Sequence, residues 1–275
     1  MNTNLRGALP LMVAALALAN APDASAQVAP PLGVIQQFSV LGGSGVTALG
    51  GAINGDVGSF PTCGIIGFPP STVTPPFILH GPVVCDGTVA TARGDATAAF
   101  LALNQGPGTV IPDQMAGTIR TSGIYTFTLG TADIAAGGTL TLSGGGNFVF
   151  ITGSSLVANV GSNISFIGGA NPCNVYWQVG SSATLNGPSF GGNIFSNASV
   201  SLGVGANLTG RAIAGSGAVT MAGANNIGGC AVAPIVPPIP PIPPGPVPPV
   251  PALPDFAAAG LLAVLLVSGV VLARR

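Results

Sequence analysis

The chain has 275 residues, of which only 5% are charged, with 6 Lys and Arg against 7 Asp and Glu. All six basic residues are Arg and all seven acidic residues are Asp, so the basic stripe that nucleic-acid binding requires is absent. The 43 Gly residues, together with Ser, Thr, Asn and short aliphatic residues, are typical of many short strands joined by tight turns.

The first 26 residues predict a secretory signal peptide. Arg6 precedes an apolar run over residues 8–19, and Ala24-Ser25-Ala26 forms a small-residue cleavage site before Gln27. We therefore expect an exported protein whose mature chain begins near Gln27, with one domain over residues 27–233.

The second half of this domain divides into rows of short strands. The segments GANLTG (205–210) and GANNIG (223–228) open alike after 18 residues, and each row contains three strands separated by Gly, Ser or Asn. An earlier row at 147–167 precedes NVYWQV (174–179) by about 27 residues, and the insertion GGANPC (168–173) accounts for part of the difference. Three short strands per repeat predict one turn of a three-sided β-solenoid, with apolar residues inward and small polar residues outward.

One convincing helix is expected in DGTVATARGDATAAFLALNQG, residues 86–106. Asp86 is a suitable N-cap, and Gly106 with Pro107 ends the pattern. An apolar stripe favours packing along one side of the solenoid, and it consists of Val89, Ala92, Ala96, Phe100 and Leu103. The tripeptide Arg93-Gly94-Asp95 lies inside this helix rather than on a loop tip, which argues against an integrin-type adhesion motif.

Four cysteines in an exported chain indicate disulfides, and four cysteines allow three pairings. We predict Cys63–Cys85, closing a Pro-rich loop, and Cys173–Cys230, tying the last coils together. A zinc site is the disfavoured alternative, because His80 is the single His and no CxxC pair exists. We expect no metal and no cofactor.

The C-terminal region has two further parts. Residues 234–254 are more than half proline and predict a semi-rigid linker. Residues 255–275 contain an uncharged apolar run at 256–273, long enough to cross a bilayer as a helix, followed by Arg274 and Arg275 on the cytoplasmic side. This pattern predicts a membrane anchor at the cell surface.

The segment PALPDF (251–256), the single span and the terminal basic pair resemble the PEP-CTERM and IPTL-CTERM sorting signals of Gram-negative bacteria. The resemblance implies an exosortase-like processing enzyme as a partner and release to the extracellular space after cleavage. The motif departs from both consensus forms, so a permanent single-span anchor is the alternative.

From Phe38 to Ile227 the chain resembles the ice-binding protein family. The segments that carry the resemblance are FSVLGGSGVTALGGAINGDVGS, TARGDATAAF, SGIYTFT, NFVFITGSSL, NVYWQVGSSATL and GRAIAGSGAVTM. The resemblance implies a mostly β fold: a three-sided discontinuous β-solenoid whose first and last coils pack together, with one long α-helix packed alongside. Together with the C-terminal transmembrane helix, this is the expected architecture. It also implies adsorption to ice.

Strongly active members of that family carry a Thr-(Ala/Gly)-x-(Thr/Asn) pattern, which residues 152–155 (TGSS) match only in part. Ice offers no charge to pair with, so a binder needs a flat surface of hydroxyls and methyls. The middle strands offer such a ladder as the candidate ice-binding residues: Ser182, Thr184, Ser199, Ser201, Ala218 and Thr220. The alternatives are a solvated face on a structural solenoid without ice activity and a cell-surface adhesin.

Catalysis is disfavoured. Between Gln27 and Pro254 the chain has five Asp and three Arg, mostly in predicted loops or on the helix, and none has an obvious catalytic partner. We therefore expect a protein that is not an enzyme.

Overall fold

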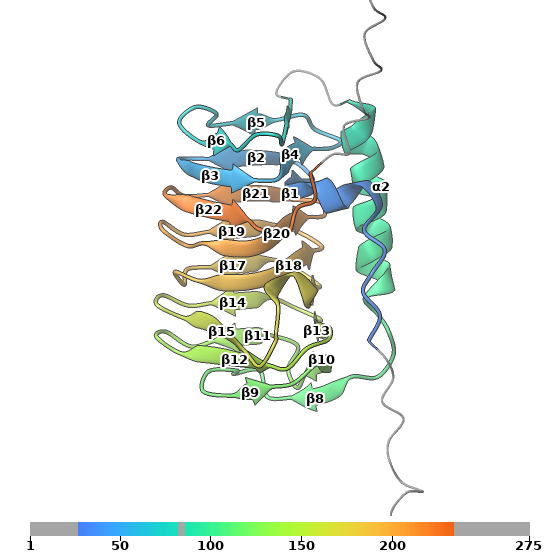
Figure 1. Ribbon diagram of the computed structural model, residues 1–275, viewed down its shortest axis with the longest axis vertical. Coiled ribbons are helices and arrows are strands. Elements are labelled where there is room, and N and C mark those ends of the chain that lie inside the picture. Colours follow the sequence, from blue (N-terminus) through green and yellow to red (C-terminus); the bar gives the residue numbers. More distant parts are fainter. Residues whose placement is uncertain (1–26, 82–85, 234–275) are drawn as a thin grey trace, which may run out of the picture. The chain divides into compact units, whose positions relative to one another are not determined.

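The computed structural model describes residues 27–81 and 86–233, which form a stack of β-coils with one α-helix along its side (Figure 1). The predicted signal peptide, the Pro-rich linker and the predicted span at 256–273 lie outside the described residues. Within the described ranges, no helix is both long and apolar enough to cross a bilayer.

The coils build three parallel sheets, here called sheets A, B and C. Sheet C contains β15 (Asn163–Ile167), β12 (Thr139–Ser143) and β9 (Ile119–Arg120). Sheet B contains, in spatial order, β11 (Ala132–Ile134), β14 (Leu156–Ala158), β17 (Ala183–Leu185), β19 (Val200–Leu202), β21 (Ala218–Met221), β2 (Gly45–Ala48) and β5 (Ile65–Ile66).

Sheet A has twelve strands. Its main path contains β6 (Thr72–Val73), β3 (Gly51–Asn54), β22 (Asn225–Gly228), β20 (Leu208–Ala214), β18 (Phe190–Ser196), β16 (Val175–Val179), β13 (Phe148–Thr152), β10 (Gly123–Phe127) and β8 (Thr109–Ile111). Off this path, β1 (Phe38–Gly42) pairs with β20 and with β4 (Asp56–Ser59), and β4 pairs with β7 (Leu79–His80).

The order of the strands in space is not their order in the chain. The first coil lies against the last one, because β1 pairs with β20, β2 with β21 and β3 with β22. The chain then passes through helix α2 (Gly87–Ala102) to β8 at the far end of the stack and winds back coil by coil (Figure 1). The solenoid is therefore discontinuous, as the family resemblance implies.

The coil steps follow the predicted repeat with two corrections. In sheet B, Ala183 pairs with Val200 and Val200 with Val219, which gives steps of 17 and 19 residues. The two GAN segments are offset by one residue, because Leu208 pairs with Ile227 and so Asn207 lies beside Asn226. Ala224, with φ 51°, lies in this longer corner.

The second correction concerns strands expected to be separate. The segments GPSFGG and GNIFSN share one seven-residue strand, β18, and LTG (208–210) continues into RAIA (211–214) as β20. The paired residues Gly192 and Gly210 adopt φ 120° and 155°, so the strands turn the corner without breaking their hydrogen-bonded ladder. Through β18 and β20, sheet A therefore extends around a corner onto a second side of the solenoid.

The interior of the tube is filled by inward side chains stacked from coil to coil. The rings of Phe150 and Trp177 stack with centroids 4.2 Å apart, and Tyr125 and Phe190 extend the row on either side. Trp177 is fully buried, and its indole N–H donates to the Gly191 carbonyl at 3.0 Å. The strand NVYWQV therefore belongs to the core.

Helix α2 covers part of sheet A. Asp86 caps its first turn by accepting a hydrogen bond from the Val89 N–H at 3.0 Å, as predicted. The helix ends at Ala102, four residues before Gly106. Its buried face packs on Phe38, Ile213 and other sheet A residues. This face contains Val89, Ala92, Ala96 and Ala99, and the C-cap residue Leu103 is buried with them. Ala99 replaces Phe100 in the fully buried stripe, and Phe100 is only half-buried.

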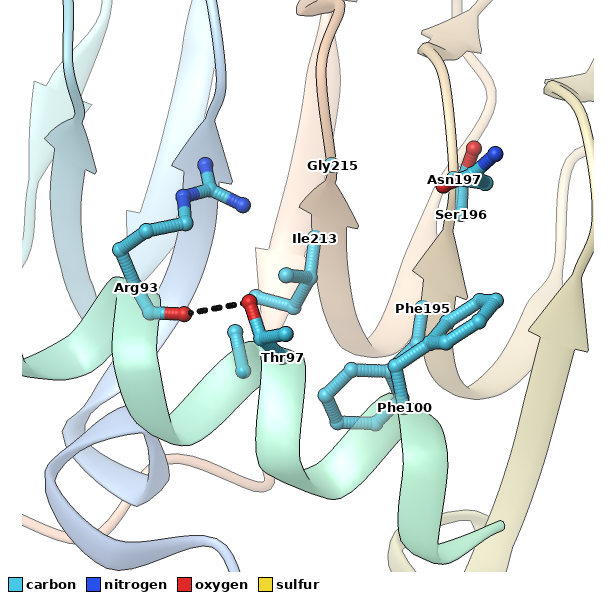
Figure 2. Close-up of a pocket in the computed structure, with 9 residues that line it drawn as sticks. Arg93, Thr97, Phe100, Phe195, Ser196, Asn197, Ile213 and Gly215 are labelled. Carbon is cyan, nitrogen blue, oxygen red and sulfur yellow. Dashed lines mark hydrogen bonds between the residues drawn. The ribbon is translucent and has the colours of Figure 1, made fainter. Parts of the chain in front are cut away.

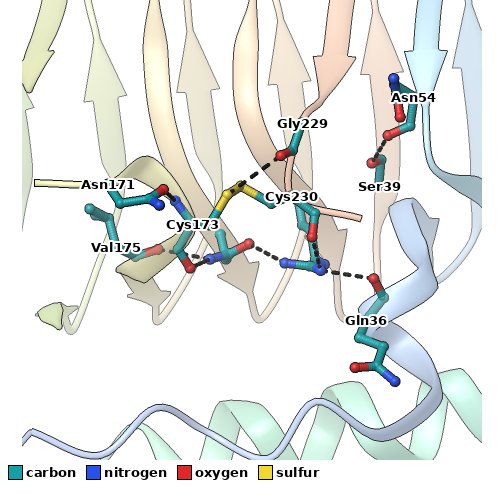
Figure 3. The surroundings of a disulfide bond; sticks show 10 residues. Gln36, Ser39, Asn54, Asn171, Cys173, Val175, Gly229 and Cys230 are labelled. Atoms are coloured by element: carbon teal, nitrogen blue, oxygen red, sulfur yellow. Dashed lines mark hydrogen bonds between the residues drawn. A yellow bond between two sulfur atoms is a disulfide. The ribbon is translucent and has the colours of Figure 1, made fainter. Parts of the chain in front are cut away.

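A disulfide and a buried arginine lie beside the joint between the first and last coils (Figure 3). Cys173 and Cys230 form one of the two predicted disulfides, with their Cα atoms 5.3 Å apart. The buried Arg211 donates to the Asn193 side chain at 2.6 Å, to the Gln36 carbonyl at 2.8 Å and to the Cys230 carbonyl. Burial lowers the pKa of Arg211 to about 10. Cys85 lies outside the described residues, so the pairing with Cys63 stays a prediction.

His80 links the second coil to the start of helix α2. Its Nε2 lies 3.2 Å from the buried carboxylate of Asp56, and its Nδ1 lies 2.8 Å from Asp86. Burial alone would lower the pKa of His80, but the hydrogen bonds and charges of the two carboxylates outweigh it and raise the pKa. Both ring nitrogens can donate only in the imidazolium form.

We predict that the free energy of unfolding falls as the pH rises above about 6.5, the ordinary pKa of His. Because the folded pKa of His80 is raised, its contribution is complete below that value and is lost as the pH rises through the folded pKa. Desolvation would raise the pKa of Asp86, yet its hydrogen bonds lower it, so its contribution is lost as the pH falls below about 4. Each unit of pKa shift corresponds to about 1.4 kcal/mol.

Urea unfolding midpoints measured across this pH range test the prediction. His80 is the single His of the chain, which makes the assignment direct. The control is His80→Gln, which keeps an amide donor toward Asp56 but does not titrate. Equal slopes for the two proteins above pH 6.5 would contradict the proposed role of His80.

Candidate functional site

Sheet B presents a continuous outward face across seven strands. Its three-residue strands are buried at the first and third positions and half-buried at the middle one, so each middle side chain points outward. The paired middle positions form one row across the sheet: Asp133, Val157, Thr184, Ser201, Thr220, Thr47 and Ile66.

All six predicted residues lie on this face, on or immediately before the adjacent strands β17, β19 and β21. Thr184, Ser201 and Thr220 are direct neighbours in the middle row. The positions two residues earlier, Ser182, Ser199 and Ala218, form a second outward row beside it, and all six residues are half-buried. Because neighbouring strands are about 4.8 Å apart and alternate residues about 6.5–7 Å apart, the rows define a regular two-dimensional array.

Sequence reasoning missed a seventh position. Thr47 on β2 pairs with Thr220, so the first coil extends the hydroxyl row by one strand. The available signal was the shared Val-Thr pair in GVTALGG (45–51) and GAVTMAG (217–223). Thr47 and Thr220 are 173 residues apart in the chain (220 − 47), and only the stacking of the first coil on the last brings them together.

The rest of the middle row is less hydroxyl-rich. Ile66, on the end strand β5, is 61% exposed, and Val157 lies on β14. Asp133 on β11 is engaged by its neighbours, since it accepts hydrogen bonds from Asn159 at 2.8 Å and from Gln114. Across β17, β19, β21 and β2, the middle row is therefore made of uncharged, short side chains.

The partial TGSS match is divided between two sheets. Thr152 ends β13 of sheet A, where its side chain is buried and donates to the Gly130 carbonyl. Ser155 precedes β14 and occupies the same outward row as Ser182. Only one of the four motif residues thus aligns with the rows of sheet B.

Other elements cover parts of the other two sides of the solenoid. Helix α2 covers part of the outer side of sheet A. On the third side, the insertion before β16 brings Phe166 and Pro172 against Gly191, where a Cβ would lie 2.4 Å from the Phe166 ring. Further along, a hollow of about 370 Å³ is lined by residues that include Asn54, Thr74, Asn207 and Thr209.

A partly buried cluster of titratable groups lies away from sheet B. His80 with Asp56 and Asp86 joins the second coil to the helix, as described above. Within the described ranges, no three His, Cys, Asp or Glu side chains gather in a way that could hold a metal ion. Arg93 and Asp95 are in the middle of α2 and make inward contacts to Ala214 and Val34, so this tripeptide is part of the helix packing, as expected.

Comparisons with known proteins agree with this geometry. The ice-binding-like family model matches residues 40–227. The chain is 35% identical over 211 residues to an ice-binding protein of Nostoc sp. (strain HG1), covering 72% of this chain and 74% of that protein. It is 32% identical over 201 residues to an ice-binding protein of Flavobacterium frigoris (strain PS1), covering 66% and 71%.

Solved structures give the same result. The crystal structure of an ice-binding protein from an Antarctic biological consortium has a TM-score of 0.68 at 31% identity, covering 74% of this chain and 92% of that one. That of the Antarctic ascomycete Antarctomyces psychrotrophicus has a TM-score of 0.65 at 30% identity, covering 73% and 98%. Because the family match extends over more than half of its length, the chain belongs to the ice-binding-like family.

Proposed function

We propose that this protein adsorbs to ice through the outward face of sheet B and inhibits ice growth or recrystallisation. The observation that carries the proposal is the row of four hydroxyl side chains, Thr184, Ser201, Thr220 and Thr47, on four adjacent parallel strands. The relatives that are named ice-binding proteins, with the same fold, support it.

The chemistry of the face suits a neutral, regular ligand. Thr and Ser hydroxyls bond water while their short side chains stay close to the sheet, and the Thr methyl groups add a mildly apolar surface. The hydrogen-bonded strands hold these groups at fixed spacing, so water on the face is ordered before it meets the crystal. No charged side chain interrupts the middle row from β17 to β2.

The ends of the described domain leave this face free. Val28 bonds to Gln105 just after α2, and Val232 bonds to the Gln36 carbonyl in the turn η1 (Gly33–Gln37) that packs on the helix. Both ends therefore meet the domain on the α2 side. We propose that the protein is exported and held at the cell surface by residues 255–275, with sheet B available to ice.

The face prediction uses bulky substitutions in the hydroxyl row. We expect Thr184→Tyr, Ser201→Tyr and Thr47→Tyr each to reduce ice-recrystallisation inhibition strongly, because a ring standing above the plane breaks many weak matched contacts. Thermal unfolding should change little, since substitutions of outward side chains are usually within about 0.5 kcal/mol. Recrystallisation assays and melting curves of the purified proteins provide the two measurements.

Thr141→Tyr on sheet C is the matched control, because Thr141 is also an outward, half-buried Thr in the middle of a strand. It should keep wild-type activity. If all four variants keep wild-type recrystallisation inhibition, the ice-binding surface lies elsewhere. A wild-type protein without ice activity would refute the proposal and favour a cell-surface adhesin or a structural solenoid.

The anchor prediction concerns residues outside those described. Deleting residues 255–275 should move the protein from the membrane fraction to the periplasm or medium, because the chain then lacks its predicted 18-residue apolar span. Cell fractionation with immunodetection measures this, and a deletion of the same length within 234–254 serves as the control. Unchanged fractionation after removal of 255–275 would show that this segment is not the anchor.

A further inference from the structure

The hollow of about 370 Å³ on the third side lies over strands β20, β22 and β3 of sheet A, where the last coil meets the first. Its shape follows from a missing side chain. Gly228 pairs with Thr209 on one side and with Asn54 on the other, so the space between those two side chains stays open. A Cβ at Gly228 would clash with the Asn54 carbonyl oxygen. No residue of sheet B lines the hollow, which is therefore separate from the proposed ice-binding face.

The hollow is bordered by exposed polar side chains whose hydrogen bonds are not taken up by the fold. Asn54, Thr74 and Thr209 are exposed, and their side chains make no hydrogen bond to another described residue. The exposed Asn226 donates its side-chain N–H to the Asn207 Oδ1 at 3.1 Å, and the same oxygen accepts the Asn226 backbone N–H at 2.8 Å. The Asn226 amide is thereby held in place with its Oδ1 available as an acceptor. The hollow thus offers two amides and two hydroxyls, which both donate and accept.

The lining and the size of the hollow select for a neutral ligand rich in hydroxyls. Every residue that lines it is uncharged, so an ionic ligand would find no partner of opposite charge there. A cavity of about 150 Å³ holds benzene, so a hollow more than twice as large accommodates about a dozen heavy atoms, the size of one hexose unit. Ala52 and the Cα atoms of Gly228 and Gly229 supply apolar surface for the C–H groups of a sugar ring.

We propose that this hollow binds one neutral hexose unit of a glycan, with the ring over Gly228 and its hydroxyls on Thr209 and Asn54. These two residues are two strands apart, which places their backbones about 9.6 Å from each other, on either side of such a ring. The Ser39 hydroxyl donates to the Asn54 carbonyl at 2.7 Å and fixes that end of the site (Figure 3). An added peptide strand would need an unpaired strand edge, but β20, β22 and β3 each have a hydrogen-bonded neighbour on both sides.

The test uses cellotriose as the probe and ligand-observed saturation-transfer NMR on the purified full chain, in a detergent without a sugar headgroup. We expect saturable transfer to the ring protons, with a Kd of about millimolar order because one hexose unit has few atoms. Tetra(ethylene glycol) is also neutral but has only two hydroxyl donors, so it should bind at least about fivefold more weakly. Equal binding of the two probes, or no saturable signal from cellotriose, would overturn the proposal.

Two variants locate the binding. Asn54→Ala and Thr209→Ala each remove a polar group that makes no side-chain hydrogen bond within the described residues, and each should weaken cellotriose binding by about fivefold. The matched control is Asn197→Ala, because Asn197 is an exposed Asn that lies beside the pocket under helix α2 instead (Figure 2). It should leave binding unchanged.

Wild-type affinity in both hollow variants, or an equal loss in the Asn197→Ala control, would contradict the assignment to this hollow. Melting curves check that the variants fold, which we expect because all three side chains are exposed. The comparison of cellotriose with tetra(ethylene glycol) on the unaltered protein decides the matter if a variant does not fold.

Discussion

The pairing of the first coil with the last is the contact on which the rest of this structure depends. In a solenoid each coil contacts only its neighbours. A first coil that lies in the middle of the stack must therefore pair with a coil from the C-terminal part of the chain. Here the strands β1, β2 and β3 take β20, β21 and β22 as that partner. Such pairing brings together residues far apart in the chain, and its loop-closure entropy must be offset by burial and hydrogen bonds.

The other unusual features of the fold follow from that joint. The chain has to travel from the second coil to the opposite end, and helix α2 makes this passage while covering sheet A with small side chains such as Ala92 and Ala96. Polar contacts then secure the joint at its margins. Arg211 ties β20 to the Gln36 and Cys230 carbonyls, and His80 ties the second coil to the helix cap at Asp86.

The same joint shapes the candidate ice-binding face. Without it, the hydroxyl row would end at Thr220, on the edge of a stack of only five coils in sheet B. With it, Thr47 continues the row and Ile66 extends the surface by a further strand. The strands of sheet B from β11 to β19 share one burial pattern, in which a single half-buried, outward residue stands between two buried ones.

Much of the molecule could be predicted from local sequence. The alternation in Ala183–Leu185 and Val200–Leu202, the Asp86 cap and the inward aromatic NVYWQV strand are short-range patterns, and the structure follows them. For the same reason the six predicted face residues lie together, since they belong to coils that are consecutive in the chain. The resemblance to ice-binding proteins supplied the discontinuous order that local patterns do not contain.

Only the tertiary structure decided the contacts between distant segments and the register of each coil. The placement of Thr47 beside Thr220, the one-residue offset of the GAN repeats and the fusion of expected strands into β18 and β20 all depend on how coils stack. The placement of His80 between the carboxylates of Asp56 and Asp86 likewise arises only when the start of helix α2 docks beside β4. Local sequence determines which way a side chain points from its own strand, whereas its neighbours are chosen by the packing of the whole chain.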